Sequence, residues 1–345
     1  MKMKIKGRKI GPSYDPLIIA EIGINHSGDI NIAKEMVDSA KRAGVEVIKH
    51  QTHIVEDEMS AEAKKVIPGN SKKSIFEIMD ECSLNFEDEL NLKQYVEDRG
   101  MIFLSTPFSR AAVDRLIEMN VPAFKIGSGE CNNYPLIEYI SSFKKPVILS
   151  TGMNTIKSIS KSVEIFNKYK IEYALLHTTN LYPTPFNLVR LGGMQKLMDK
   201  FPGVPVGLSD HTTNNLSSYA AVSLGASIIE RHFTDKMTRL GPDIICSMDE
   251  YNCNELIKNS KIIKSMLGGE KAPAKEEKVT IDFAFATVVS IKDINKGEKF
   301  SEDNLWVKRP GTGEIMAEHY NKILGKKSKV NIKRDKHINW KDIES

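Results

Sequence analysis

The sequence lacks the features of a membrane, secreted or nucleic-acid-binding protein. It has no run of about 18 apolar residues, and its basic N-terminus has no apolar segment of the kind found in signal peptides. Its net charge is only +4, which argues against a nucleic acid or a membrane as a partner. No CxxC or zinc-ribbon spacing joins its cysteines, so we expect reduced thiols in a cytoplasmic protein. The cysteines are Cys82, Cys131, Cys246 and Cys253.

The composition is that of an ordinary globular protein, 41% hydrophobic and 27% charged. Short apolar runs alternate with helical patterns eight times within about 250 residues, which is the count of an α/β fold of the (β/α)8 TIM-barrel type. The expected strands are Leu17–Ile22, Val45–Lys49, Met101–Ser105, Ala123–Ile126, Pro146–Leu149, Glu172–His177, Val204–Leu208 and Ala226–Arg231. The expected helices are residues 30–43, 86–99, 110–119, 135–143, 155–169, 191–200, 215–224 and 250–267, with a short one at 74–80.

An open, doubly wound α/β sheet is the competing fold. Such a sheet normally has fewer strands and a glycine-rich G-x-G-x-x-G turn after its first strand. The turn after the first expected strand reads GINHSG and lacks this pattern. We therefore predict the barrel.

A change in composition near residue 268 predicts a second domain. Residues 268–280 (GGEKAPAKEEKVT) are rich in charge with glycine and proline, which is typical of a linker. We expect a barrel domain over residues 1–267, a linker over 268–280 and a small domain over 281–345. Within the small domain we expect strands in FAFATVVS (283–290) and NLWVKRP (304–310), and short helices in SEDNL (301–305) and AEHYNKILGK (317–326).

Two histidines are expected to meet at one edge of the barrel. Residues 204–243 read as strand, helix and strand, so the two strands should be parallel neighbours. His211 follows the first of these strands, and His232 ends the second. Because parallel strands end on the same edge of a sheet, the two imidazoles should converge there, with Asp243 nearby. This predicts a divalent-metal or acid–base site, although two satisfied structural histidines would give the same pattern.

Polar residues also follow the other expected strands, at the end of a barrel where active sites lie. Strand alternation turns Lys49 inward together with Val47, and Glu230 inward together with His232. By the same alternation His50 and His177 fall on the opposite face, so we expect them to be structural. The strand-end residues are Glu21, Asn25, His26, Lys49, Gln51, Thr106, Lys125, Ser128, Ser150, Asn180, Tyr182, Ser209, His211, Glu230 and His232.

Two lysines, Lys49 and Lys125, should point into the barrel mouth, where an unpaired ammonium is costly. Glu21 and Glu230 could be their partners, which would make the cluster purely structural. The surrounding neutral hydrogen-bonding side chains favour a phosphate or carboxylate ligand instead. A metal, an anion pocket and an acidic group together indicate carbon–carbon or phosphoryl chemistry on a phosphorylated small molecule.

Several longer motifs follow one another in order along nearly the whole chain. They are AEIGINHSG, KHQTHIVEDEMS, IPGN, STPFS, KIGSGE, ILSTGM, TNLYPTP, GLSDHT, ERHFTD and GPD. Together they resemble the bacterial N-acetylneuraminate (sialic acid) synthases. The tail, from DFAFATVV through NLWVKRPGTGE, resembles the C-terminal antifreeze-like (SAF) domain of that family.

The resemblance implies a metal-dependent TIM-barrel enzyme that works as a domain-swapped homodimer. Such an enzyme condenses phosphoenolpyruvate with open-chain N-acetylmannosamine and water, releasing phosphate by C–O cleavage to give N-acetylneuraminate. The implied cofactor is a divalent metal, Mn²⁺ first, with Mg²⁺ or Co²⁺ as alternatives. A role in the biosynthesis of capsule or another surface polysaccharide follows from the same resemblance.

The resemblance also implies catalytic roles for Glu21, Glu230 and Arg309. Glu21 would be the acid/base carboxylate, Glu230 would orient the metal site, and Arg309 from the partner's tail would reach the sugar N-acetyl group. His211 and His232 would hold the metal. Phosphoenolpyruvate would be bound by Lys49, Thr106, Lys125, Ser128, Ser150, Asn180 and Ser209, and the sugar by Gln51, Asn70, Tyr182, Asp243 and Arg309.

Two other functions stay open. A sister synthase would accept a 2,4-diacetamido-trideoxy sugar in the same anion pocket and make a legionaminic- or pseudaminic-type acid, although KHQTHIVEDEMS is more similar to the N-acetylmannosamine branch. A non-catalytic protein could use the tail to bind ice or a partner. Ice binding is opposed by the 16 basic and 12 acidic residues after position 270.

Overall fold

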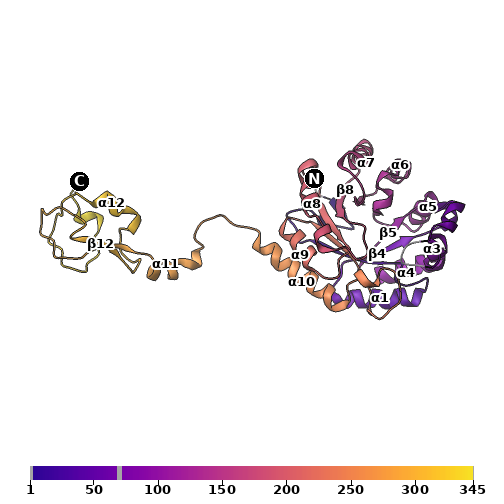
Figure 1. The fold of residues 1–345 in the computed structure, drawn as a ribbon, viewed down its shortest axis with the longest axis horizontal. Helices are drawn as coiled ribbons and strands as arrows, with labels where there is room; N and C mark the ends of the chain where they lie inside the picture. Colours follow the sequence, from indigo (N-terminus) through magenta and orange to yellow (C-terminus); the bar gives the residue numbers. More distant parts are fainter. Residues whose placement is uncertain (1–2, 68–71, 345) are drawn as a thin grey trace. The chain divides into compact units, whose positions relative to one another are not determined.

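The computed structural model describes residues 3–67 and 72–344. The chain divides into two compact units, Met1–Gly268 and Gly269–Ser345, whose elements are drawn in Figure 1. Within the described residues, no helix combines the length and the hydropathy needed to cross a bilayer.

Eight parallel strands of the described chain close into a barrel in the order β10, β3, β4, β5, β6, β7, β8 and β9. The last strand returns to the first so that His232 lies beside Glu21. The TIM-barrel prediction is confirmed, because a closed barrel excludes the open doubly wound sheet. The strands are β3 (Leu17–Gly23), β4 (Val47–Thr52), β5 (Ile102–Pro107), β6 (Phe124–Ile126), β7 (Val147–Ser150), β8 (Tyr173–Thr178), β9 (Val206–Asp210) and β10 (Ile228–His232).

Helices surround the strands (Figure 1), and all the predicted helices except the short one at 74–80, which ends two residues later, match to within one residue at each end. Helix α1 illustrates why the ends of these helices can be predicted from the sequence. The Asp29 side chain accepts a hydrogen bond from the backbone N–H of Asn31 at its start, and Gly44 takes φ 92° at its end. The helices are α1 (Ile30–Ala43), α4 (Phe86–Asp98), α5 (Arg110–Glu118), α6 (Tyr134–Ser142), α7 (Ile156–Tyr169), α8 (Gly192–Lys200), α9 (Leu216–Ser223) and α10 (Glu250–Met266).

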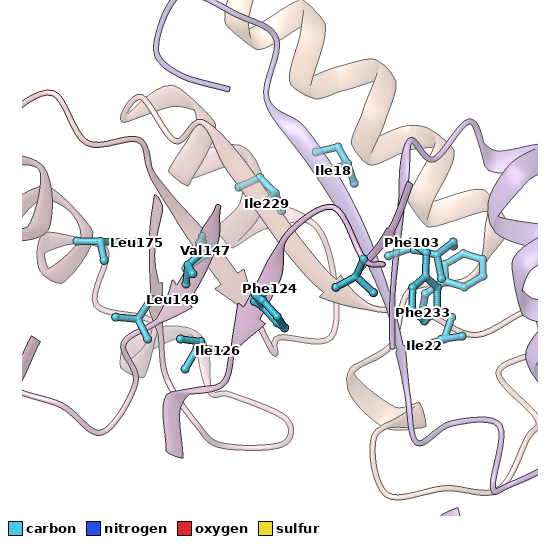
Figure 2. Packing of buried hydrophobic residues seen from close by; sticks show 14 of the residues in the cluster. Ile18, Ile22, Phe103, Phe124, Ile126, Val147, Leu149, Leu175, Ile229 and Phe233 are labelled. Carbon is cyan, nitrogen blue, oxygen red and sulfur yellow. The ribbon is translucent and has the colours of Figure 1, made fainter. Parts of the chain in front are cut away.

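The main hydrophobic core lies between the strands and the helices that cover them. Alternate strand residues face this layer. Phe124 and Ile126 of β6, for example, lie in register with Val147 and Leu149 of β7, and all four are fully buried (Figure 2). This outer core fixes the strands in place, and it leaves the other row of each strand for the interior of the barrel.

The interior of the barrel is apolar at one end and polar at the other. An N-terminal hairpin of β1 (Met3–Ile5) and β2 (Arg8–Ile10) packs its buried side chains against the inward rows of the barrel strands. Along β3 the inward row runs from Ile19 to Glu21, and along β4 it runs from Val47 to Lys49. The change from apolar to polar places the charged side chains at the carboxyl ends of the strands.

A long connection between β4 and α4 forms one wall of that end. It contains a short helix α2 (Val55–Glu58), a 3-10 turn η1 (Ala61–Lys65) and helix α3 (Ile75–Cys82). Helix α3 was predicted, and it begins at a capping box between Ser74 and Glu77. The two shorter elements were not predicted, because four or five residues carry too little periodicity to be recognised.

The second unit contains an antiparallel pair of strands, β11 (Thr287–Ser290) and β12 (Leu305–Lys308), around its own small core. The expected strand over 283–290 is wrong at its start, because helix α11 (Lys278–Ala284) precedes it. An i,i+4 ion pair between Lys278 and Asp282 supports this helix. The helix expected in SEDNL is also wrong, since the Asn304 side chain accepts from the backbone of Ser301 and forms a turn. The helix expected in AEHYNKILGK is present as η6 (Ala317–His319) and α12 (Tyr320–Ile323).

Candidate active site

A cavity of about 430 Å³ lies at the carboxyl ends of the barrel strands. Most of the residues singled out from the sequence line it. They are Glu21, Lys49, Gln51, Thr106, Lys125, Ser128, Ser150, Asn180, Tyr182, Ser209, His211, Glu230, His232 and Asp243. Asn70 lies outside the described residues. Arg309 is exposed in the second unit, directly after β12.

Two lysines and two glutamates form a compact charged cluster at the floor of the cavity. Lys49 Nζ lies 2.8 Å from Glu21 Oε1 and 3.8 Å from Glu230 Oε1, and Lys125 Nζ lies 3.2 Å from the same Glu230 oxygen. None of these four side chains is more than 6% exposed. The cluster is therefore charge-balanced, and any anionic ligand must share lysines that already have partners.

The two lysines are not equivalent. Burial lowers the pKa of Lys49, but the carboxylates of Glu21 and Glu230 outweigh it, so the pKa of Lys49 is raised. Burial also lowers the pKa of Lys125, and the attraction of Glu230 offsets only part of that shift. Burial raises the pKa of Glu230, but Lys125 and Lys49 outweigh it and hold this pKa at about 2. Glu230 is thus an anion at neutral pH.

Neutral hydrogen-bonding groups surround the cluster. Lys49 donates to Thr106 Oγ1 at 3.3 Å, and Lys125 donates to Ser150 Oγ at 2.8 Å. Ser209 Oγ donates to Glu230 Oε1 at 3.3 Å. Within the described chain, the second carboxylate oxygens of Glu21 and Glu230 and the amide oxygen of Asn180 are buried without a hydrogen-bond partner. Buried polar atoms are seldom left unpaired, so these three indicate where a ligand or water would bind.

The two predicted histidines do converge. The ring centroids of His211 and His232 are 5.4 Å apart, and Tyr182 stacks on His211 at 4.2 Å. His211 Nδ1 lies 3.0 Å from the Thr179 carbonyl oxygen, so it donates there and leaves Nε2 with its lone pair. Burial and the neighbouring His232 lower the pKa of His211 to about 3. The imidazole of His211 is therefore neutral, as a metal ligand must be.

A buried network holds the turn that carries His211. Asp210 Oδ2 accepts from the Ser217 and Ser218 hydroxyls, both at 2.6 Å. From the neighbouring strand, the buried Arg231 donates to the Thr212 carbonyl oxygen at 2.6 Å. Since Arg231 lies between Glu230 and His232 and points to the opposite face, one stretch of β10 both supports the turn and supplies two cavity residues.

The two histidines can hold a divalent metal only if molecules other than this chain supply further ligands. In the described part of the chain, no group of three or more His, Cys, Asp and Glu side chains is arranged to hold an ion. Two imidazoles remain, and His232 Nδ1 is buried without a hydrogen-bond partner, 3.6 Å from Asp243 Oδ2. Imidazole ligands suit Zn²⁺, Fe²⁺, Ni²⁺ and Cu²⁺, whereas Mn²⁺ and Mg²⁺ also need oxygen ligands, which water or substrate would supply here.

Other histidines near the barrel have partners outside the cavity. His50 lies 3.2 Å from Glu89 on one side and 3.2 Å from His26 on the other, and His177 lies 2.7 Å from the Val189 carbonyl oxygen. These contacts account for His50 and His177 without a ligand. Of the strand-end residues, His26 and Asn25 do not line the cavity.

Sequence reasoning missed the residues that the β4–α4 connection brings to the cavity. His53 and Glu58 are polar, and the rest form an apolar wall. The alternation that placed Lys49 and Gln51 inward also predicts an inward residue 53, so His53 could have been found. The apolar wall carries no such signal, because its position depends on how the connection folds. The wall residues of this connection are Met59, Ile75, Ile78 and Met79, and Phe108, directly after β5, joins them.

The cavity can thus bind an anion between two lysines beside a pair of metal-competent histidines. Comparison with known proteins identifies the family of this chain. The model of the NeuB family matches residues 36–272, and that of the SAF domain matches residues 285–344. The chain belongs to the NeuB family. It is therefore a sialic-acid-type synthase by family, and the resemblance inferred from its motifs is confirmed.

Relatives of this NeuB-family chain extend over nearly its full length. An uncharacterized protein of Methanocaldococcus jannaschii is 40% identical, covering 99% of this chain and 98% of that protein. The N,N'-diacetyllegionaminic acid synthase of Campylobacter jejuni is 38% identical, covering 93% and 98%. A sialic acid synthetase of Leptospira borgpetersenii, solved with citrate, is 30% identical with a TM-score of 0.73, covering 81% of this chain and 95% of that one.

Proposed function

We propose that this NeuB-family chain condenses phosphoenolpyruvate with an open-chain N-acylated amino sugar, N-acetylmannosamine being the first candidate. The observation that carries the proposal is the buried Lys49–Lys125 pair beside His211 and His232. In the reaction, C3 of phosphoenolpyruvate bonds to the aldehyde carbon of the sugar. Water then adds at C2, and the C2–O bond to phosphate breaks to release inorganic phosphate.

The lysines and hydroxyls would bind the phosphate and carboxylate of phosphoenolpyruvate. Lys49 and Lys125 supply charge, and the hydroxyls of Thr106, Ser150 and Ser209 already touch the charged cluster and can reorient toward an anion. Because Glu230 stays ionised beside both lysines, phosphoenolpyruvate would enter a site that is not excessively positive. Such a site favours release of the phosphate product as well as binding of the substrate.

Glu21 would act as the acid/base carboxylate. Its Oε1 binds Lys49 and Gln51, whereas Oε2 is buried without a hydrogen-bond partner in the described chain. A free, desolvated carboxylate oxygen in the cavity is what the attack of water on C2 needs as a proton acceptor.

His211 and His232 would hold a divalent metal, which we propose to be Mn²⁺, with Mg²⁺ or Co²⁺ as alternatives. When bound, the metal would act as a Lewis acid on the sugar aldehyde. The two imidazoles would hold it beside Asp243 and Tyr182, and we expect the sugar to lie between these residues and Gln51.

A second candidate substrate is the 2,4-diacetamido-trideoxy sugar of the legionaminic acid branch. Two observations favour it: the 38% identity to a synthase of that branch, and the apolar wall that the β4–α4 connection contributes. A trideoxy sugar has a C6 methyl and a second acetyl methyl where N-acetylmannosamine has hydroxyls, and apolar contacts suit those methyls. The anion and metal sites would be the same for both substrates.

Phosphate release tests the proposal directly. With Mn²⁺ and phosphoenolpyruvate, we expect release of phosphate that depends on an added amino sugar, measured separately with N-acetylmannosamine and with the diacetamido sugar. Release with the diacetamido sugar alone would move the substrate assignment to the second candidate. Folded, metal-loaded protein that releases no phosphate with either sugar would contradict the synthase function for this cavity.

Arg309 provides a prediction for the second unit. We propose that this unit completes the site of a partner subunit in a domain-swapped homodimer, with Arg309 on the sugar N-acetyl group. Arg309→Ala is then expected to raise the KM for the sugar by roughly 10- to 100-fold, the value of a hydrogen bond from a charged donor. Arg334→Ala, an exposed arginine of the same unit, is the matched control and should keep the KM unchanged.

Mixed dimers test the swap itself. A dimer of one Glu21→Gln chain and one Arg309→Ala chain would contain one intact barrel and tail pairing if the tails are exchanged. Activity at low sugar concentration should therefore return on mixing two impaired variants. If each tail serves its own barrel, both sites of the mixed dimer are defective and mixing restores nothing.

A further inference from the structure

His53 lines the cavity but has none of the roles proposed above. It is 5% exposed and stacks on Phe108 with ring centroids 4.5 Å apart. Its Nδ1 lies 2.8 Å from Glu58 Oε2, and its Nε2 lies 3.0 Å from Gln51 Oε1. The ring is thus held at both nitrogens and on one face, so its orientation is fixed by the protein alone.

The amide of Gln51 extends these contacts to the proposed acid/base residue. Its Nε2 donates to Glu21 Oε1 at 2.7 Å, which leaves the amide oxygen facing His53. Turning the amide over would set its oxygen against the Glu21 carboxylate, and two acceptors would then face each other. The order Glu58, His53, Gln51, Glu21 is therefore the arrangement that satisfies each of these hydrogen bonds.

Both ring nitrogens of His53 face oxygen atoms in this arrangement. Nδ1 faces the Glu58 carboxylate, and Nε2 faces the Gln51 amide oxygen. A hydrogen bond that involves a charged group is shorter and stronger than a neutral one, so the 2.8 Å contact with the Glu58 carboxylate is the firmer anchor of the ring. The short helix α2 makes this possible, because it turns the chain back so that Glu58 reaches a residue five positions earlier.

These hydrogen bonds affect the two carboxylate oxygens of Glu21 differently. Gln51 and Lys49 both bind Oε1 of its carboxylate, and Oε2 is buried without a partner in the described chain. We propose that His53 and Glu58 form a positioning pair that keeps the Gln51 amide on Glu21 Oε1 and so leaves Oε2 free to exchange the proton of the reaction. The proposal rests on the synthase function, and it adds two residues of the β4–α4 connection to the reaction machinery.

A double-mutant cycle between His53 and Gln51 tests this pair. His53→Ala and Gln51→Ala are each expected to lower kcat by roughly 10- to 100-fold, the cost of about 1 Å of misplacement. Each should also raise the KM for the sugar, and neither should change the KM for phosphoenolpyruvate. Because His53 acts through Gln51, the double variant should be no worse than Gln51→Ala alone. Glu58→Gln should act in the same direction as His53→Ala.

His177→Gln is the matched control. His177 is another buried histidine of the barrel, 9% exposed, and it bonds to a backbone carbonyl away from the cavity. We expect this variant to have lower thermal stability at most, with kcat and both KM values close to those of the parent. Multiplicative losses in the His53/Gln51 double variant, or parent-like kinetics of His53→Ala, would overturn the positioning role.

A second measurement does not depend on turnover. In crystal structures of the substrate-free parent and His53→Ala proteins, we expect the Gln51 amide to leave Glu21 Oε1 in the variant only. An unchanged Gln51–Glu21 hydrogen bond in the variant would contradict the proposal even if the enzyme is active. Conversely, a lost bond in a protein that releases no phosphate from phosphoenolpyruvate would keep the positioning pair and reject the synthase reaction.

Discussion

Glu21→Gln is expected to lower kcat for phosphate release by roughly 10²- to 10⁴-fold, the contribution of a positioned general base. Glutamine keeps the shape of the side chain but cannot accept the proton at the position of Oε2. The loss should fall mainly on kcat, since the lysines that we propose to bind phosphoenolpyruvate stay in place. Initial rates of phosphate release at saturating phosphoenolpyruvate and sugar provide the measurement.

The glutamine variant also removes the closer of the two counter-charges of Lys49, which is 2.8 Å from Glu21 and 3.8 Å from Glu230. Some loss of stability is therefore expected, and unfolding must be measured beside the rates. Glu89→Gln is the matched control, because Glu89 is a fully buried carboxylate that bonds to His50 and Thr52 outside the cavity. A Glu21→Gln enzyme with more than a tenth of the parent rate would remove Glu21 from the chemistry.

Much of this site could be predicted because a barrel strand has only two faces. The alternation of β4 fixes Lys49 and Gln51 inward and His50 outward, and the closure of the barrel sets His232 beside Glu21. No distance is needed for these conclusions, only the order of the strands. The shared use of one Glu230 oxygen by both lysines could not be predicted, because it depends on side-chain rotamers across the barrel.

The connection between β4 and α4 was the least predictable part of the site. Glu58 reaches His53 because α2 is a single helical turn. The apolar residues of the same connection line the cavity because of how the connection folds, which the alternation of a strand does not predict. Helix α11 was missed for a related reason. Its residues include Val279, Ile281 and Phe283 at strand-like spacing, but the Lys278–Asp282 pair supports a helix instead. The hydrophobic pattern of this segment is therefore ambiguous between strand and helix.

His211→Ala is expected to weaken Mn²⁺ binding by more than the roughly 10- to 100-fold that loss of an outer-shell partner costs, because it removes a side chain that we propose to be a direct ligand. One imidazole would remain, and the described residues contain no third acidic or histidine side chain arranged to replace the other. Calorimetric titration of metal-free protein with Mn²⁺ measures the effect without turnover. Phosphate release should fall in parallel, and chelation of the parent protein should reproduce the loss reversibly.

The metal prediction separates two explanations for the histidine pair. If His211 and His232 only pack against each other and Tyr182, replacing either should change stability but leave Mn²⁺ binding as it was. The matched control is again His177→Gln, whose imidazole is buried and bonded to a backbone carbonyl, as that of His211 is. Equal Mn²⁺ affinity in His211→Ala, His232→Ala and this control would place the ion elsewhere. Affinity lost in the first two variants alone would place it between the two imidazoles, in the same cavity as Glu21 and the two lysines.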